Sequence, residues 1–243
     1  MLENKVIIYD DSCPMCRLYT YWFVAWGFLK PENRIGFASA PDSITRRVDL
    51  DRGRHEIPLF DRSTGETIYG LRAMTFILEE RSRWMKPVFR TRLFGWMFCP
   101  LYEIITYNRR VIAGCKHCGG YDCAPDLNRF YRSIYLAIVA VVVMCIAVLL
   151  MLCSLPAAKI GLAALSALSI CGTISGALVR VFSGKWAGWN FAANYATTVL
   201  IVALTLAPLT SETIGLSLGE PASWIVLGTA MLLGLGELRR REI

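Results

Sequence analysis

Two cysteines separated by two residues, Cys13 and Cys16, lie near the start of the chain in the segment YDDSCPMC. A pair with this spacing can exchange a disulfide, supply half of a zinc site, or pack without chemistry. The apolar run KVIIY before the pair predicts a buried strand, and residues 16 to 30 predict a helix. Pro14 would then occupy the first helical position, where its missing N–H is tolerated. These surroundings favour redox exchange over metal binding.

The start of a helix suits a reactive thiol, because its unpaired N–H groups and partial positive charge stabilise a thiolate. We expect Cys13 to be the accessible nucleophile that attacks a substrate disulfide, and Cys16, one turn further on, to resolve the mixed disulfide. Asp10 ends the preceding strand, where it could shuttle a proton for Cys16 or only cap the turn. Asp11 and Ser12 are expected to be local capping groups.

The residues that follow predict a small α/β domain that would hold this pair. RIGFAS predicts a second strand, PDSITRRVDLD a polar helix or loop, EIPLFDRSTGETIYG a hairpin, and LRAMTFILEERSRW a helix. This order, with the cysteine pair between the first strand and the first helix, is the thioredoxin arrangement. Pro58 begins the predicted third strand, where thioredoxin-like folds have a cis proline opposite the cysteine pair.

The chain resembles the DCC family of thiol-disulfide oxidoreductases over roughly residues 4 to 113. Asp10, Cys13 and Cys16 match its motif, as do TGETIYGLRAM and the late helix LYEIITYNRRV with Asn108 and Arg109. The chain departs from the family at Asp11, where the family has glycine, so the turn differs and a second carboxylate stands beside the pair. The resemblance implies a thioredoxin-like domain over residues 1–113 that exchanges disulfides without an obligatory cofactor.

A second cysteine cluster, CKHCGGYDC, contains Cys115, His117, Cys118 and Cys123 and lies in a predicted linker of residues 114–132. Three thiols and an imidazole could form a tetrahedral zinc site, although the tight spacing makes it hard for all four to reach one ion. Cys115 and Cys118 could instead be a second dithiol that relays electrons. The remaining alternative is a turn-rich loop with reduced thiols.

The charge distribution divides the chain near residue 132. The first part contains 20 Lys or Arg and 15 Asp or Glu residues, and the second contains only 6 and 4. Residues 133–243 predict an all-α transmembrane bundle of about four helices, at 133–153, 157–179, 190–209 and 222–238. Basic residues in the second connection and at the C-terminus place both termini in the cytoplasm of a bacterial inner membrane. Neither a basic stripe nor a known module predicts nucleic-acid binding.

Residues 84 to 105, WMKPVFRTRLFGWMFCPLYEII, alternate aromatic and basic side chains. This segment could lie on the inner leaflet with its basic residues toward the headgroups, or it could pack against the first domain.

Together these features predict a membrane-tethered thiol-disulfide oxidoreductase. Its partners would be a protein or small-molecule thiol or disulfide and the lipid bilayer, and it would need no cofactor. The alternative is a non-enzymatic membrane scaffold, or a zinc-binding module that uses both cysteine clusters.

Overall fold

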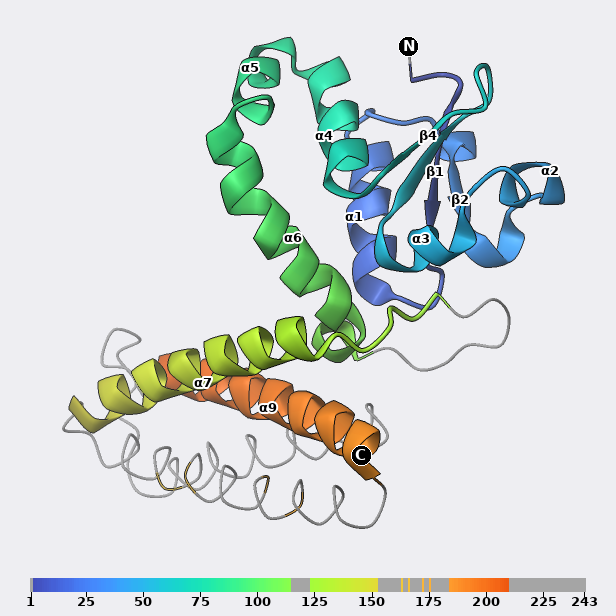
Figure 1. Ribbon diagram of the computed structural model, residues 1–243. Helices are drawn as coiled ribbons and strands as arrows, with labels where there is room; N and C mark the ends of the chain where they lie inside the picture. The colour runs from blue at the N-terminus through green and yellow to red at the C-terminus, as the bar shows by residue number, and fades with distance from the viewer. Residues whose placement is uncertain are drawn as a thin grey trace. The chain divides into compact units, whose positions relative to one another are not determined.

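A computed structural model describes residues 2–114, 123–152 and 184–209, with the single positions 163, 166, 172 and 175 (Figure 1). The chain divides into two units, Met1–Tyr131 and Arg132–Ile243. The predicted linker, residues 114 to 132, therefore falls within the first unit except for its last residue. Each unit is described by itself.

The first unit contains a mixed four-stranded sheet with the order β2-β1-β3-β4. Its strands are β1 Lys5–Tyr9, β2 Arg34–Gly36, β3 Pro58–Asp61 and β4 Thr67–Tyr69. β1 pairs in parallel with β2 and antiparallel with β3, and β3 pairs antiparallel with β4. The predicted first strand and hairpin are thus confirmed.

Alternate side chains of a strand point to opposite faces of the sheet, and both faces are buried here. Ile7 and Leu59 pack with helix residues such as Phe23 and Ile77 on one face. The opposite face carries a second buried cluster whose members are Val6, Ile8, Phe37, Ile44, Val48, Phe60 and Cys123. A strand covered on both faces needs an uninterrupted apolar run, which is what KVIIY supplies.

The helices of the first unit differ from the predictions mainly in their lengths. They are α1 Pro14–Ala25, α2 Asp42–Thr45, α3 Leu50–His55, α4 Gly70–Arg81, α5 Lys86–Phe89 and α6 Arg92–Ala113. α1 begins at Pro14, as predicted. The polar segment after β2, for which a helix or a loop was predicted, forms two short helices. The later part of the predicted second strand forms a 3₁₀ turn, Phe37–Ser39.

α6 is the longest helix of the first unit, and defined caps set its two ends. The Thr91 hydroxyl accepts a hydrogen bond from the Phe94 amide at 3.1 Å, which satisfies an otherwise unpaired N–H at the helix start. Gly114 ends the helix with a φ of 61°, a left-handed conformation that glycine adopts without strain.

Of the helices with described bounds, α7 Arg129–Leu152 and α9 Gly184–Leu209 lie mostly or wholly in the second unit. Over the described residues, only Arg129–Leu149 of α7 is long and apolar enough to cross a membrane, a test that core helices of soluble proteins also pass. α9 covers the third predicted span, but its described residues do not meet that test. The fourth predicted span and nearly all of the second lie outside the described residues. The prediction of about four transmembrane helices is therefore not supported.

Candidate functional site

The cysteine pair begins at a tight turn between β1 and α1. Asp10 forms this turn, because its Oδ1 accepts hydrogen bonds from the Ser12 amide at 3.0 Å and the Ser12 hydroxyl at 2.6 Å. The Cys13 amide donates to the Asp10 carbonyl at 3.2 Å. Cys13 is the N-cap residue of α1, and Pro14 follows at the first helical position. The short polar sequence Asp-Asp-Ser therefore converts the end of a strand directly into a helix start.

Both thiols of the pair are buried. Cys13 is 0% exposed and Cys16 is 3% exposed. A hydrogen bond with Cys13, together with burial, raises the pKa of the Cys16 thiol well above its usual range. The prediction that Cys13 is accessible is therefore wrong for this state of the molecule. A helix start is usually open to solvent, but here α6 and the chain that follows it return to this edge of the sheet.

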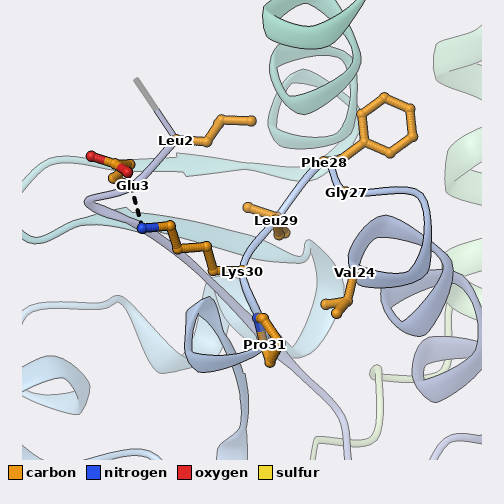
Figure 2. Close-up of a pocket in the computed structure, with 8 residues that line it drawn as sticks. All are labelled: Leu2, Glu3, Val24, Gly27, Phe28, Leu29, Lys30 and Pro31. Carbon is orange, nitrogen blue, oxygen red and sulfur yellow. Dashed lines mark ion pairs between the residues drawn. The ribbon is translucent and has the colours of Figure 1, made fainter.

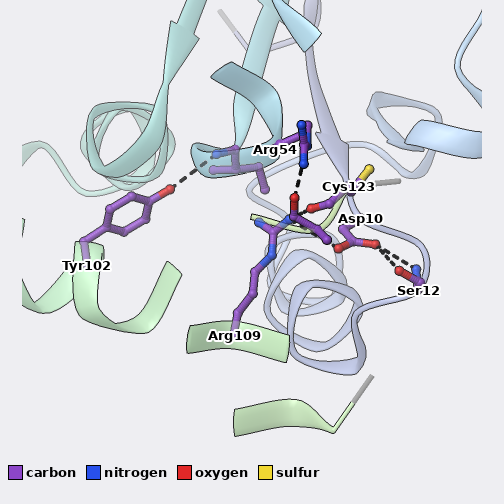
Figure 3. A network of polar contacts seen from close by, with 8 residues as sticks. Asp10, Ser12, Arg54, Tyr102, Arg109 and Cys123 are labelled. Carbon is purple, nitrogen blue, oxygen red and sulfur yellow. Dashed lines mark hydrogen bonds and ion pairs between the residues drawn. The ribbon is translucent and has the colours of Figure 1, made fainter. Parts of the chain in front are cut away.

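Arg109 on α6 brings a positive charge to the pair (Figure 3). Its guanidinium donates to Asp10 Oδ2 at 3.3 Å, and the side chains of this ion pair are almost completely buried. The same nitrogen donates to the Cys123 carbonyl. Burial alone would lower the pKa of Arg109, but the nearby charges of Cys16, Asp10 and Cys13 raise it. One guanidinium thus lies within electrostatic reach of both thiols and a carboxylate.

Residues 123–126, which we call the covering segment, are held against this site from α3 as well (Figure 3). Arg54 donates to the Ala124 carbonyl and to Asp126 Oδ1, both at 3.0 Å. His55 Nε2 lies 3.2 Å from Asp126 Oδ2. Arg109 binds the other end of the segment through the Cys123 carbonyl. The covering segment is therefore fixed at both ends by cationic or imidazole side chains.

Cys123 itself belongs to the apolar cluster on the sheet face opposite α1. Burial, followed by the charge of Asp10, raises the pKa of the Cys123 thiol to about 12. A thiol with this pKa is almost fully protonated at neutral pH and is a poor nucleophile. Cys123 therefore acts here as a packing residue whose backbone carbonyl faces Arg109.

Two tyrosines complete the surroundings of the pair. Burial, followed by the charge of Cys16, raises the pKa of Tyr19 well above its usual value, and Tyr19 also forms a hydrogen bond with Cys16. The Tyr102 hydroxyl accepts a hydrogen bond from the Ile57 amide at 3.3 Å, which links α6 to the residue before β3 (Figure 3). Both hydroxyls remain protonated and can act as hydrogen-bond donors.

Asp11 contacts the end of β2. Its Oδ2 accepts a hydrogen bond from the Ala38 amide at 2.8 Å, so it binds the distant 3₁₀ turn after β2 and is not the local cap that was predicted. A Cβ placed on Gly36 would lie only 1.6 Å from Asp11 Oδ1. The carboxylate at position 11 is therefore accommodated by a glycine on the neighbouring strand.

Pro58 begins β3, as predicted, and is almost completely buried. The pairing of Ile7 with Leu59 puts Pro58 beside the end of β1 that leads to Cys13. No peptide bond among the described residues is cis, so the expected cis bond before Pro58 is wrong. The proline thus has the predicted place in the sheet but the trans bond that most prolines adopt.

The second cysteine cluster falls mostly outside the described residues, so the structure does not test the predicted metal site there. Cys115, His117 and Cys118 lie outside the described residues, and Cys123 is the described member. Among the residues that the structure places, no three His, Cys, Asp or Glu side chains are grouped to hold a metal ion.

A pocket of about 420 Å³ lies near the N-terminus, away from the cysteine pair (Figure 2). Its wall includes Leu2, Val24, Phe28 and Leu29, and an ion pair between Lys30 and Glu3 at 2.9 Å lies at its edge. It is next to the first residues of β1, whereas the pair follows the last residue of that strand. No cysteine lines it, so it is not part of the candidate site.

The residues that sequence reasoning missed are those that reach the site from distant parts of the chain. Arg109 was noticed only as part of a family motif, and the roles of Arg54, Tyr19 and Tyr102 were not predicted. The Asn-Arg pair in the second half of α6 was the available signal, because such residues are rarely buried unless they have partners. No protein-family model, curated protein or solved structure matches this chain.

Proposed function

We propose that the first unit is a thioredoxin-like thiol-disulfide oxidoreductase that uses Cys13 and Cys16. The observation that carries the proposal is the hydrogen bond between the two thiols at the start of α1, beside the buried guanidinium of Arg109. The strand order β2-β1-β3-β4, with the pair between β1 and α1, agrees with a thioredoxin-like fold. A dithiol in this position is suited to exchange because both sulfurs share one end of a helix.

The raised pKa of Cys16 assigns the roles. Cys16 keeps its proton and hydrogen-bonds the Cys13 sulfur, which favours negative charge on Cys13. The Cys13 thiolate attacks a substrate disulfide, a mixed disulfide forms, and one substrate sulfur leaves as a thiol after taking up a proton. Cys16 then loses its proton and attacks Cys13 Sγ. The second substrate thiol leaves, the Cys13–Cys16 disulfide forms, and two electrons pass to the substrate.

Asp10 and Arg109 would position and tune this chemistry. Arg109 supplies a fixed positive charge that favours a thiolate in the pair, because opposite charges stabilise the ionised form. Asp10 lies close enough to Cys16 for its charge to raise the pKa of that thiol. We assign Asp10 as the acceptor of the Cys16 proton in the resolving step. Its Oδ1 keeps the turn in place at the same time.

Exchange requires that Cys13 become accessible, because a thiol that is 0% exposed cannot meet a substrate disulfide. The covering segment is the part that we propose to move: polar contacts from Arg54, His55 and Arg109 hold it at the site, and Cys123 is its one member in the apolar cluster of the sheet. The reactive state is therefore one in which residues 123–126 have moved away from α3 and α6.

The second unit would tether this activity to a bacterial inner membrane, with both termini in the cytoplasm. The apolar stretch Arg129–Leu149 supports a membrane anchor. The substrates would be protein or small-molecule thiols and disulfides, and the exchange itself needs no cofactor.

The experiment is a redox titration of the full chain in detergent, with thiols trapped by differential alkylation and mapped by mass spectrometry. We expect a reversible disulfide between Cys13 and Cys16 over the potential range of glutathione buffers. Cys16→Ser should trap a mixed disulfide between Cys13 and a model substrate, whereas Cys13→Ser should trap none. Cys99→Ser, which changes an exposed cysteine of α6, is the matched control and should leave the titration unchanged.

Two outcomes would overturn the proposal. One is the absence of a Cys13–Cys16 disulfide at any potential in that range. The other is protection of both thiols by a bound metal that a chelator removes, which would favour the zinc-binding module instead.

A further inference from the structure

Large apolar side chains of α5, α6 and the turn before them are exposed and form a continuous stretch of the chain. We call this stretch the α5–α6 surface; its exposed apolar members are Trp84, Val88, Leu93, Trp96, Met97, Phe98 and Leu101. Trp96 is 77% exposed and Met97 is 52% exposed. Contiguous apolar exposure of this kind marks an interaction site in a stable protein.

The first half of α6 is exposed on all sides and not along one stripe. Each residue from 96 to 101 is exposed, and their sequence is WMFCPL. Successive residues of a helix point about 100° apart, so six of them cover the whole circumference. A helix that is apolar all round is normally surrounded by apolar material. Because the described residues leave this part of α6 uncovered, something of that kind has to cover it.

The charges of the same stretch identify the partner. Between residues 82 and 102 the chain carries Arg83, Lys86, Arg90 and Arg92 and no acidic residue. Arg90 lies 3.7 Å from Glu79 but its side chain is still mostly exposed. Tryptophan and phenylalanine mixed with basic residues match the boundary between lipid headgroups and acyl chains, where aromatic rings and cations both find partners. Anionic headgroups supply the complementary charge.

We propose that the α5–α6 surface lies on an anionic lipid bilayer. Leu93, Trp96, Met97 and Leu101 lie below the headgroups, and the four basic residues lie at the level of the headgroups. A symmetric contact with a second copy would bring this basic patch against its own equivalent, and like charges oppose such an interface. A bilayer meets both the apolar and the basic requirement at once. This inference does not depend on the chemistry of Cys13 and Cys16.

The test uses the full chain with the photoreactive residue p-benzoylphenylalanine in place of Met97, reconstituted into vesicles of phosphatidylcholine and phosphatidylglycerol in a 3:1 ratio. Illumination should attach phospholipid to the peptide that contains position 97, as detected by mass spectrometry. The matched control carries the same residue in place of Arg62, which is exposed at the turn between β3 and β4. It should give no lipid adduct.

The charge requirement is tested in the same assay. Changing the four basic residues to glutamine should lower the yield of adduct about tenfold or more in the anionic vesicles, because the variant loses the attraction between these cations and the anionic headgroups. Vesicles of phosphatidylcholine alone should give a similarly low yield with the original basic residues. Protection of Cys16 from alkylation, measured in parallel, reports that each variant is folded.

Three results would overturn the inference. A crosslink from position 97 to a second copy assigns the surface to a homodimer. A crosslink to residues of the second unit assigns it to packing within the chain. Lipid adducts that are equally strong at position 62 show only that the whole molecule is near the vesicle.

Discussion

The two halves of α6 differ in the kind of side chain that they bury. In the N-terminal half, the apolar residues Trp96, Met97 and Leu101 are exposed. In the C-terminal half, the polar residues Asn108 and Arg109 are buried, and Asn108 is 0% exposed. Asn108 donates to the Ile104 carbonyl at 2.8 Å and to the Tyr131 carbonyl at 3.1 Å.

Specific polar partners hold the C-terminal half in place, whereas the N-terminal half exposes its apolar side chains. Burying a polar group is unfavourable unless it is hydrogen-bonded. The Asn108 amide nitrogen and the Arg109 guanidinium have partners outside α6, whereas Asn108 Oδ1 and Arg109 Nε are buried without a hydrogen bond. The partners are Asp10 from the end of β1 and backbone carbonyls of the chain that follows α6. We therefore expect substitutions in α6 to destabilise the first unit less and less from position 109 back to position 97.

The largest effect is expected at the ion pair. Arg109→Met should lower the free energy of unfolding of the first unit by about 3–5 kcal/mol, because it leaves the Asp10 carboxylate buried without its partner. The measurement is the urea concentration at which buried Cys16 becomes open to a short alkylation pulse in the full chain. The double variant Asp10→Asn, Arg109→Met should lose less stability than Arg109→Met alone. An equal or larger loss in the double variant would contradict the pairing.

A smaller effect is expected one residue earlier. Asn108→Ala removes two hydrogen bonds from a fully buried side chain and should destabilise the first unit by about 1–3 kcal/mol in the same alkylation assay. Asn194→Ala is the control, because Asn194 lies in the second unit and its amide donates to the carbonyl of Asn190 within α9. If both variants shift the midpoint alike, Asn108 is not a specific anchor.

Tyr102 lies between the two halves and should have an intermediate effect. Tyr102→Phe deletes the acceptor of the Ile57 amide and should cost about 0.5–1.5 kcal/mol. The midpoint of Cys16 alkylation again gives the value. A change as large as that of Arg109→Met would mean that the gradient along the helix does not exist.

The smallest effect is expected in the exposed half. Met97→Ser should change the stability of the first unit by no more than about 0.5 kcal/mol, as is usual for an exposed side chain. A destabilisation above about 1 kcal/mol would show that position 97 packs inside the protein.

Local patterns predicted the parts of the fold that local chemistry decides. The run KVIIY gave β1, Pro14 marked the start of α1, and the turn-rich DRSTGE gave the hairpin of β3 and β4. The burial of Cys13 could not be predicted in this way, because it depends on residues near positions 109 and 123 that return to the site. The bond before Pro58 is trans although its place in the sheet was predicted, since position in a strand does not determine the isomer.

The site itself was predicted only as far as its own segment. Cys13, Cys16 and Asp10 were found from their spacing and from the strand before them. The buried charge of Arg109 is almost a hundred positions away in the sequence, and no helical periodicity distinguishes it from a solvated arginine. For the membrane, hydropathy alone predicted four spans, while only Arg129–Leu149 meets the length and composition test within the described residues.

The complete burial of Cys13 has a consequence for its chemical lifetime. Hydrogen peroxide converts an exposed thiolate first to sulfenic acid and then to sulfinic acid, and the second product is in general not recovered. A thiol that is 0% exposed is shielded from a peroxide molecule that diffuses past. In the exchange that we propose, a macromolecular substrate would replace the contacts of the covering segment as it binds. That segment would then separate disulfide partners from small oxidants by their ability to bind.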